Sequence, residues 1–238
     1  GNSADQGAVN LLAPPSCCKH WAASPNSPWL QCVPSEGTTS AEPQTVAVTV
    51  ADAALALQRH RGAVTFRTDL GYCRTVMIDV KVYPANLVAR SFEAEAGKVA
   101  GGFRTVRDDS ASGGAYLDRP DDENLPTGSA EFSFDVPETG VYYVAARCFV
   151  PSPDAGLHDS FEFAMDGATK RTWDLEGVGT DRWNWTLVSA RDEASPCRFA
   201  LTKGRHRLVI YTRERLTRLD RVVITNSPYA EEPKALGE

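Results

Sequence analysis

Two glutamates stand one residue apart in the stretch FEAEAG at positions 92–97. The alternation that follows predicts a strand, and residues i and i+2 of a strand project from the same face, so Glu93 and Glu95 would place two like charges side by side. A hard divalent cation about 2.3 to 2.6 Å from carboxylate oxygens would turn that repulsion into a shared attraction. The tripeptide alone favours the alternative, which is a pair of solvated surface side chains.

The same carboxylates raise the question of catalysis. Alpha carbons at i and i+2 lie ~7 Å apart, within the range in which the carboxylates of inverting glycosidases are found, but two groups on one strand face cannot flank a scissile bond from opposite sides. The run HDS at 158–160 holds the residue types of a hydrolytic triad, yet consecutive strand residues diverge. No GxSxG, HExxH or phosphate-loop motif occurs. We therefore expect no catalytic residues.

Aromatic side chains near predicted loops could support another chemistry. Sugars stack their apolar faces on aromatic rings while a few polar groups fix the hydroxyls. In the stretch DRWNW, Trp183 and Trp185 share a strand face, and Tyr116 and Trp173 are the other aromatic candidates. The alternative is that one or both tryptophans of the pair pack between sheets, which is the commoner fate of a strand tryptophan.

Apolar alternation predicts the strands that position these side chains. The runs TVAVTV, AVTF and TVMIDVKVY alternate with a period of two, and the one helix candidate covers about 51–60. The alternation stops at 84–91 and resumes in runs such as DSFEFAMDGAT, which reads as a strand closing on an Asp166-Gly167 turn. We predict an all-β chain with an Ig-like β-sandwich at 1–86, a jelly-roll β-sandwich at 90–228 and a tail at 229–238.

Composition excludes several classes of partner. The 238 residues carry a net charge of −6 from interspersed acids and bases, which argues against a nucleic-acid partner. No apolar run approaches the roughly 18 residues of a membrane span, so membrane insertion is not expected. We expect a monomer.

The six cysteines favour a secreted or cell-surface location. None forms a CxxC pair, and the adjacent Cys17 and Cys18 point to opposite faces of an extended chain, which disfavours a shared metal ion with His20. A mixture of disulfides and free thiols, in an oxidising and extracytoplasmic setting, is the favoured interpretation. Cys148 and Cys197 are the two cysteines of the second section and could form its internal bridge.

The second section resembles the carbohydrate-binding modules of families 6 and 35. The matching pieces run in the family's order over about 92–226, and they are FEAEAG, SASGGAYLD, TGVYYVAAR, HDSFEFAMDG, WNW, LTKGRHRLVIY and RLDRVVITN. The resemblance implies a galactose-binding-like jelly roll that binds a polysaccharide or oligosaccharide. It also implies a structural calcium held by Glu93, Glu95 and Asp220 together with backbone carbonyls.

The resemblance assigns further residues to the ligand. Tyr116 matches a family loop that often contributes a stacking ring, and Asp159 would hydrogen-bond a sugar or brace a loop. Where many family 6 members carry a ligand-binding asparagine, this chain has Arg218. Arginine can grip a carboxylate with two parallel hydrogen bonds, so this departure admits an acidic ligand. The alternative is that Arg218 is an exposed charged residue with no role in ligand binding.

The first section resembles the Ig-like BACON domain of bacterial secreted carbohydrate-processing proteins. The resemblance rests on SPWLQCVPSEGTTSAEPQTVAVTV and GAVTFRT, mainly on Trp29, Pro34, Gly37 and the alternating valines. Such domains commonly serve as spacers. The expectation is a non-catalytic binding fragment of a larger secreted bacterial polysaccharide-processing protein. The alternative is a structural or protein-interaction module that kept the fold and lost the sugar site.

Overall fold

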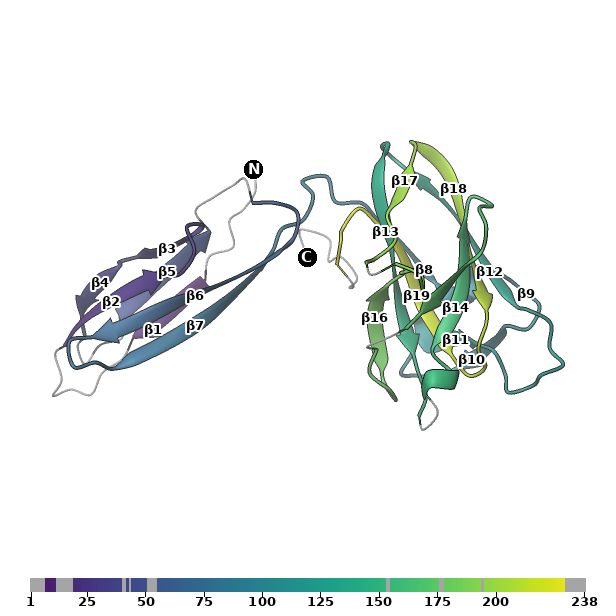
Figure 1. Ribbon diagram of the computed structural model, residues 1–238, viewed down its shortest axis with the longest axis horizontal. Coiled ribbons are helices and arrows are strands. Elements are labelled where there is room, and N and C mark those ends of the chain that lie inside the picture. Colours follow the sequence, from purple (N-terminus) through teal and green to yellow (C-terminus); the bar gives the residue numbers. More distant parts are fainter. Residues whose placement is uncertain are drawn as a thin grey trace. The chain divides into compact units, whose positions relative to one another are not determined.

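The computed structural model describes residues 7–11, 19–39, 42, 44–50, 55–152, 155–175, 178–193 and 195–229. The chain forms two compact units, Gly1–Ala85 and Asn86–Glu238, whose strands are labelled in Figure 1. Each unit has its own hydrophobic core. Helical structure in these ranges is limited to short 3-10 turns. They are η1 Ala94–Ala96, η2 Ser112–Gly114 and η3 Ala155–Leu157. The prediction of an all-β chain is confirmed.

The first unit consists of two antiparallel sheets. Its strands are β1 Gly7–Leu11, β2 His20–Pro25, β3 Leu30–Val33, β4 Glu36–Thr38, β5 Gln44–Val50, β6 Arg59–Thr68 and β7 Cys73–Lys81. One sheet has the order β1-β5-β3 and the other β4-β2-β6-β7. Alternate residues of β5 and β6 face the core, where Val46, Val48 and Phe66 surround the buried ring of Trp21. Whether this unit is a BACON-like spacer stays a prediction.

One local prediction for this unit is wrong. Helical turns were expected over about 51–60, but Arg59 and His60 begin β6 and pair with Lys81 and Val80 of β7. Positions 51–54 lie outside the described residues. The hairpin partner β7 pairs with β6 from Arg59 to Arg67, and such pairing overrides a weak local helix preference.

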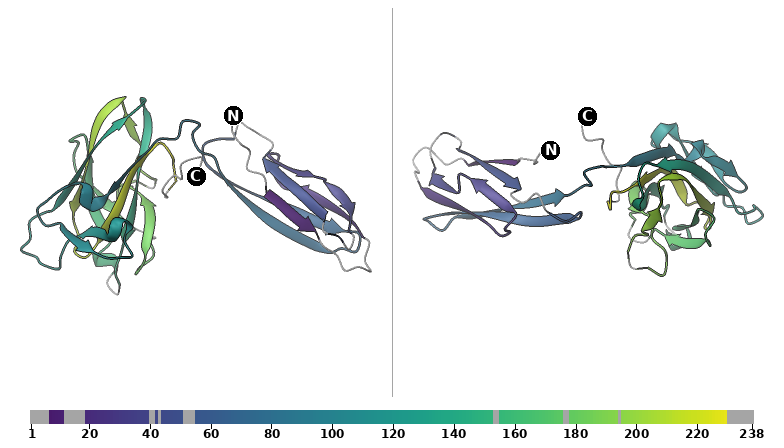
Figure 2. Two further views of the ribbon diagram at one scale, coloured as in Figure 1. Left: turned by 180° about the vertical axis from the view of Figure 1, so that it is seen from behind. Right: turned by 90° about the horizontal axis from the view of Figure 1, so that it is seen from above.

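The second unit is a two-sheet sandwich, seen from further directions in Figure 2. Its strands are β8 Ala89–Glu93, β9 Lys98–Ala100, β10 Arg104–Arg107, β11 Ala115–Asp118, β12 Ser129–Val136, β13 Gly140–Phe149, β14 Ser160–Met165, β15 Arg171–Asp174, β16 Trp183–Leu187, β17 Phe199–Leu201, β18 Gly204–Thr212 and β19 Arg218–Thr225. One sheet has the order β10-β11-β19-β13-β16, with β8 also paired to β19 and β17 to β13. The other has the order β15-β14-β18-β12-β9.

The core of the second unit lies between these two sheets. Strand alternation places Phe132 and Ile210 inward from one sheet and Leu117 and Val222 inward from the other, all of them at most 1% exposed. The inner faces therefore interdigitate in one apolar layer, and the outer face of the β10-β11-β19-β13-β16 sheet is left to carry polar and aromatic side chains. This outer face holds most of the candidate site.

A hairpin turn between β14 and β15 follows the sequence prediction. Asp166 and Gly167 both have positive φ values, 50° and 75°, and the N–H of Ala168 donates to the carbonyl of Met165 at 2.9 Å. Positive φ at both central residues is the mirror-image turn that matches the twist of paired strands, and an Asp-Gly pair tolerates it well.

A β-bulge interrupts the pairing of β19 with β13. Arg147 pairs with Arg221, but the next residue, Cys148, pairs with Leu219, so Asp220 is the extra residue on β19. A bulge bends the strand and re-aims a side chain. Asp220 is 0% exposed as a result of where this bulge places it, and it enters the candidate site.

The bridge considered between Cys148 and Cys197 is not formed. Both thiols are free and buried, and Cys197 contacts Arg171 and Glu193 at 3.7 Å each instead. Burial raises the pKa of both thiols, most strongly for Cys148. Cys17 and Cys18 lie outside the described residues. Within the described part of the chain, helices are too short for any of them to traverse a bilayer.

Candidate functional site

The two glutamates of the opening stretch do not share a strand. Glu93 is the last residue of β8, whereas Glu95 lies in the 3-10 turn η1, so the prediction that both project from one strand face is wrong. The turn nevertheless keeps the two carboxylates close enough to interact. Burial raises the pKa of Glu95, and the neighbouring Glu93 charge raises it further.

Asp220 lies within the same neighbourhood but already has partners. Its Oδ1 accepts the N–H of Ser112 at 2.9 Å, and its Oδ2 accepts a guanidinium N–H of Arg147. Burial raises the pKa of Asp220 against the lowering effect of the Arg147 contact, and Glu93 contributes to the rise. The bulge is the structural reason that a carboxylate of a core-lining strand can reach this position.

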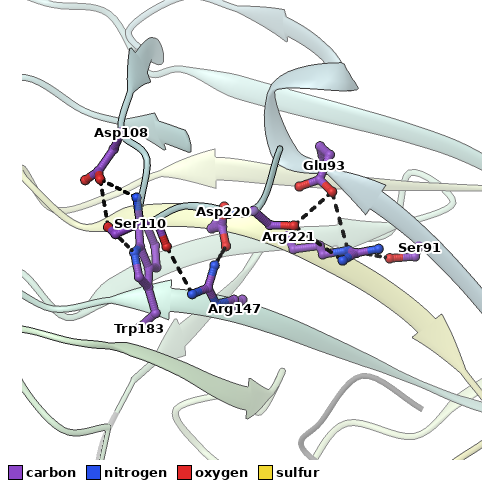
Figure 3. Close-up of polar contacts among 9 residues, drawn as sticks. Ser91, Glu93, Asp108, Ser110, Arg147, Trp183, Asp220 and Arg221 are labelled. Carbon is purple, nitrogen blue, oxygen red and sulfur yellow. Dashed lines mark hydrogen bonds and ion pairs between the residues drawn. The ribbon is translucent and has the colours of Figure 1, made fainter. Parts of the chain in front are cut away.

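Ser112 joins Glu93 to Asp220. Its hydroxyl donates to Oε1 of Glu93 at 3.0 Å while its N–H binds Asp220. Arg221 contacts the same group, with Nε 3.6 Å from Oε1 of Glu93 and Nη1 3.3 Å from the hydroxyl of Ser112. Figure 3 shows the polar contacts of Glu93 and Asp220 with Arg221 and Arg147. We call Glu93, Glu95 and Asp220 the acidic group.

The acidic group fits a cation through its glutamates. Oε2 of Glu93 and Oε2 of Glu95 are buried and have no hydrogen-bond partner, which is costly for carboxylate oxygens unless a cation is bound. Asp220 does not complete the expected set of three, because both of its oxygens bind other groups. Across the described ranges, no three His, Cys, Asp or Glu side chains converge in an arrangement that could hold a metal ion.

Trp183 lies at the centre of an aromatic cluster. Its ring meets Tyr116 and Phe149 edge to face, with ring centroids 5.4 Å apart in each pair. The indole N–H donates to the hydroxyl of Ser110 at 3.1 Å. We call Tyr116, Phe149, Trp183 and Arg218 the aromatic cluster. Trp183 and Phe149 are half-buried, which leaves part of each ring facing outward.

Tyr116 supports this cluster from beneath. It is only 5% exposed, because Trp183 lies at its edge and the guanidinium carbon of Arg218 lies 5.1 Å from its ring centroid. Tyr116 therefore has little ring surface for a ligand. It packs under the residues that do, which differs from the stacking role that the family resemblance implied.

The guanidinium of Arg218 lies over two rings. Its guanidinium carbon is 4.3 Å from the centroid of Phe149 as well as 5.1 Å from that of Tyr116, a cation–π arrangement. The positive charge of Arg218 also contributes to the lowered pKa of two nearby carboxylates, Asp108 and Asp181. Hydrogen bonds from Ser110 lower the pKa of Asp108, those from Ser152 lower the pKa of Asp181, and Arg218 adds to both. Within the described ranges the guanidinium of Arg218 makes no hydrogen bond or ion pair.

The remaining predicted tryptophans lie elsewhere. Trp185 is half-buried and packs against Ala145, Leu187 and Val223 on the outer face of its sheet. Trp173 is 0% exposed and packs on Phe161, so it is a core residue. Strand alternation correctly placed Trp183 and Trp185 on one face, but only Trp183 joins the aromatic cluster.

Asp159 lines a separate polar hollow of about 440 Å³. Its backbone N–H donates to Glu214 at 2.9 Å, and burial together with Glu214 raises the pKa of its carboxyl. Asp174 in the same hollow forms two 2.7 Å bonds with Arg191. The charged groups here bind one another, and Tyr116, Trp183 and Arg218 do not line this hollow.

Sequence reasoning missed Phe149, Arg147 and Ser110. Phe149 and Arg147 are i and i+2 on β13, so the strand period does place them on one face. What the sequence lacks is the pairing that sets Phe149 beside Trp183 and Arg147 beside Trp185. No signal in the sequence indicates that Ser110 meets an indole N–H.

Comparisons with known proteins give structures but no sequence family. No protein-family model matches the chain, and no curated protein sequence matches it. A family 35 carbohydrate-binding module of Clostridium thermocellum is 18% identical, with a TM-score of 0.42, and the match covers 57% of this chain and 97% of that one. The C-terminal family 6 module of a Zobellia galactanivorans laminarinase is 14% identical, with a TM-score of 0.41, over 58% of this chain and all of that one.

A β-(1,4)-mannanase of Podospora anserina that carries a family 35 module is also similar. It is 13% identical, with a TM-score of 0.44, over 61% of this chain. This chain spans 28% of the length of that enzyme.

Proposed function

We propose that the second unit is a non-catalytic carbohydrate-binding module whose ligand lies on the aromatic cluster. The observation that carries the proposal is the pairing of two outward-facing rings, Trp183 and Phe149, with a guanidinium that has no hydrogen-bond partner among the described residues. Rings stack on the apolar face of a sugar, and free N–H donors bind its oxygens. Ser110 and Arg147 hold the Trp183 ring in place from behind.

The bound carbohydrate is proposed to be acidic. A guanidinium that is stacked on Phe149 and Tyr116 keeps its N–H edge available, and this edge matches the two oxygens of a carboxylate. A neutral sugar would use only part of that donor set. The charge of Arg218 contributes to the lowered pKa of Asp108 and Asp181, but these carboxylates accept hydrogen bonds from Ser110 and Ser152 and not from Arg218.

A structural calcium is proposed at Glu93 and Glu95. Their buried, partnerless oxygens support this assignment, since a hard cation takes carboxylate oxygens as ligands. When bound, the cation would neutralise the repulsion between the two glutamates. Asp220 is assigned to Arg147 instead of to the metal.

We also propose that the second unit has no glycosidase activity. Glu93 ends β8 and Glu95 lies two residues further on, in η1, so the two carboxylates leave neighbouring points of one short segment. A glycosidase needs two carboxyl groups on opposite sides of the scissile bond. Incubation with each test polysaccharide should release no reducing sugar, and release would revive an enzyme function.

One observation favours a second candidate. The side chain of Arg218 covers parts of Tyr116 and Phe149, so a ligand could not stack on those parts of the two rings. In a module that kept the fold but lost sugar binding, the rings would be covered in this way by a side chain of the protein itself. Such a module would serve as a structural or protein-interaction unit. Secretion, a monomeric state and origin in a larger polysaccharide-processing protein are proposed for either candidate.

Affinity gel electrophoresis separates the two candidates. Gels contain β-1,4-mannan, β-1,3-glucan, β-1,3-galactan or polygalacturonate, and the variants are Trp183→Ala and Trp185→Ala. Carbohydrate binding predicts that wild type and Trp185→Ala are retarded in at least one gel and that Trp183→Ala is not. Retention on none of the gels favours the scaffold candidate. Retention that survives Trp183→Ala moves the ligand away from the aromatic cluster.

A further inference from the structure

One short loop contacts both the acidic group and the aromatic cluster. It joins β10 to β11 and comprises residues 108–114. Ser112 binds Asp220 through its N–H and Glu93 through its hydroxyl, at 2.9 and 3.0 Å. Two residues earlier, the hydroxyl of Ser110 accepts the indole N–H of Trp183 at 3.1 Å. Figure 3 shows the Trp183 and Glu93 ends of this network.

The loop is closed on itself by backbone hydrogen bonds. The N–H of Asp108 donates to Gly114 at 3.0 Å, that of Ala111 to Asp108 at 3.0 Å, and that of Gly114 to Ala111 at 3.2 Å. Gly113 has a φ of 63°, and a Cβ there would lie 3.3 Å from Cδ of Glu93, so the loop backbone packs directly on that side chain. A loop braced in this way transmits a displacement at its acidic end to Ser110.

Arg147 provides a second link between the same two places. One guanidinium nitrogen donates to Asp220, and the other donates to the carbonyl oxygen of Ser110 at 3.2 Å. Its guanidinium carbon also lies 5.1 Å from the centroid of the Trp183 ring. The side chain is 24% exposed, so these contacts are partly shielded from water.

We propose that the 108–114 loop and Arg147 position the Trp183 ring in response to the acidic group, so that a divalent cation on Glu93 and Glu95 and a carbohydrate on Trp183 strengthen each other's binding. This inference rests on the proposed function. Arg147 is a positioning residue, since it acts through Trp183 and Ser110. Coupling of this kind is reciprocal, so each ligand raises the affinity for the other by the same factor.

The sign of the coupling follows from charge. Without a cation, Glu93 repels both Glu95 and Asp220, and the loop is anchored on Glu93 and Asp220 through Ser112. A cation removes the repulsion and fixes Glu93, so that Ser112 and then Ser110 are held more firmly. A Trp183 ring that is already ordered loses less conformational freedom when a sugar stacks on it.

Two variants cut the link at different points. Arg147→Lys keeps a positive charge beside Asp220, but one ammonium cannot reproduce the planar fork that bridges Asp220 and the Ser110 carbonyl. Ser110→Ala removes only the hydroxyl that accepts from Trp183. The matched control is Arg207→Lys, because Arg207 pairs with Glu131 on the other sheet, at 3.3 Å. Circular dichroism and thermal melts verify that each variant folds.

The first measurement needs no carbohydrate. Calcium is titrated into the protein, and Trp183 emission is obtained by subtracting the spectrum of Trp183→Phe, because the chain has five tryptophans. Wild type and Arg207→Lys should show a saturable change in Trp183 emission. Arg147→Lys and Ser110→Ala should bind calcium in calorimetry but show a change less than half as large. No calcium binding by wild type, or an equal change in all four proteins, overturns the link.

The second measurement repeats the affinity gels in calcium and in chelator. Wild type and Arg207→Lys should bind the retaining polysaccharide at least about fivefold more tightly with calcium, the lower end of typical coupling between sites. Arg147→Lys and Ser110→Ala should lose that difference. Equal retention of wild type in both conditions overturns the inference while the binding function stands. Retention on no gel, with the fluorescence change intact, overturns the binding function and the reciprocal coupling but leaves the loop as the link to Trp183.

Discussion

The guanidinium of Arg218 is stacked on the ring of Phe149, with its carbon 4.3 Å from the ring centroid. The two residues lie opposite each other on β19 and β13, so strand register brings them together. The guanidinium has no hydrogen-bond or ion-pair partner among the described residues, so its N–H groups are available to a ligand. In the proposed function, this pair is the feature that favours an acidic over a neutral ligand.

Replacing Arg218 should therefore change selectivity. Arg218→Gln should weaken binding to polygalacturonate about tenfold or more, because a charge-assisted hydrogen bond contributes roughly 1.5 to 3 kcal/mol. Binding to neutral polysaccharides should change much less. Affinity gels of both kinds measure the ratio, and Arg205→Gln is the control, since Arg205 pairs with Asp135 at 3.0 Å on the other sheet. Equal losses on both kinds of gel would contradict an acidic preference.

Glu95 should affect stability in opposite directions with and without calcium. In the calcium-free protein, Glu95→Gln should raise the free energy of unfolding by about 1 kcal/mol, because a neutral amide replaces a partly buried charge and ends its repulsion with Glu93. In calcium, wild type should gain stability by mass action, about 2.7 kcal/mol at a hundredfold excess over Kd, and the variant should not. Urea unfolding measures both.

The control for that experiment is Glu138→Gln, an exposed glutamate after β12. It should follow wild type in calcium and in chelator. A wild-type melt that is unchanged after rigorous calcium removal and re-addition would count against the cation at Glu93 and Glu95. A calcium response that persists in Glu95→Gln would place the cation elsewhere.

His206 should make stability fall as pH rises. Burial alone would lower the pKa of His206, but its Nδ1 lies 2.7 Å from Oδ2 of Asp166 and its Nε2 lies 2.6 Å from the carbonyl of Thr202, and these acceptors raise it. Both ring nitrogens must donate, so the imidazolium is the bound form. Because the folded pKa is the higher one, the stabilisation is complete below the ordinary pKa of about 6.5 and is lost as pH rises through the folded value.

Thermal melts across that range test this expectation. Wild type should lose more melting temperature than His206→Gln between mildly acidic and mildly alkaline pH, because the variant has no proton to lose. Asp166→Asn should reduce the slope as well, since it removes one of the two acceptors. Parallel slopes in wild type and His206→Gln would show that another group controls the dependence.

Arg104 should be needed to keep Asp118 buried. Asp118 is 4% exposed and receives two hydrogen bonds from Arg104, at 3.0 and 2.7 Å. Arg104→Gln should cost about 2 kcal/mol in urea unfolding, less than for a fully buried pair because Arg104 is half exposed. Arg107→Gln on the same strand is the control, and Asp118→Asn added to Arg104→Gln should recover part of the loss. No cost in Arg104→Gln would mean that water replaces the arginine.

The sequence was informative wherever a local rule decides the outcome. A period of two located strands such as β5, β14 and β19, and it placed Trp183 and Trp185 on one face. The turn predicted at Asp166-Gly167 forms because both residues tolerate a positive φ. The resemblance to carbohydrate-binding modules implied ligand roles for Glu93, Glu95 and Arg218.

Several features depend on contacts between distant segments. Glu95 leaves the strand in a 3-10 turn, Tyr116 lies beneath Trp183 and Arg218, and the helix expected near Arg59 is a strand paired with β7. The two buried cysteines remain free thiols. For Tyr116 and Arg59, a partner far away in the chain, which no local pattern specifies, sets the environment of the residue.

The amino-acid sequence by itself determined the all-β class, the position of most strands and the residue types available for a cation and a sugar, because strand period and turn chemistry act between neighbours in the chain. Only the tertiary structure decided which of those residues meet. A single extra residue on β19 turns Asp220 toward Arg147, and pairing of β13 with β16 sets Phe149 beside Trp183. Register and bulges arise from pairing energies summed over whole strands, so they cannot be assigned from any one stretch of sequence.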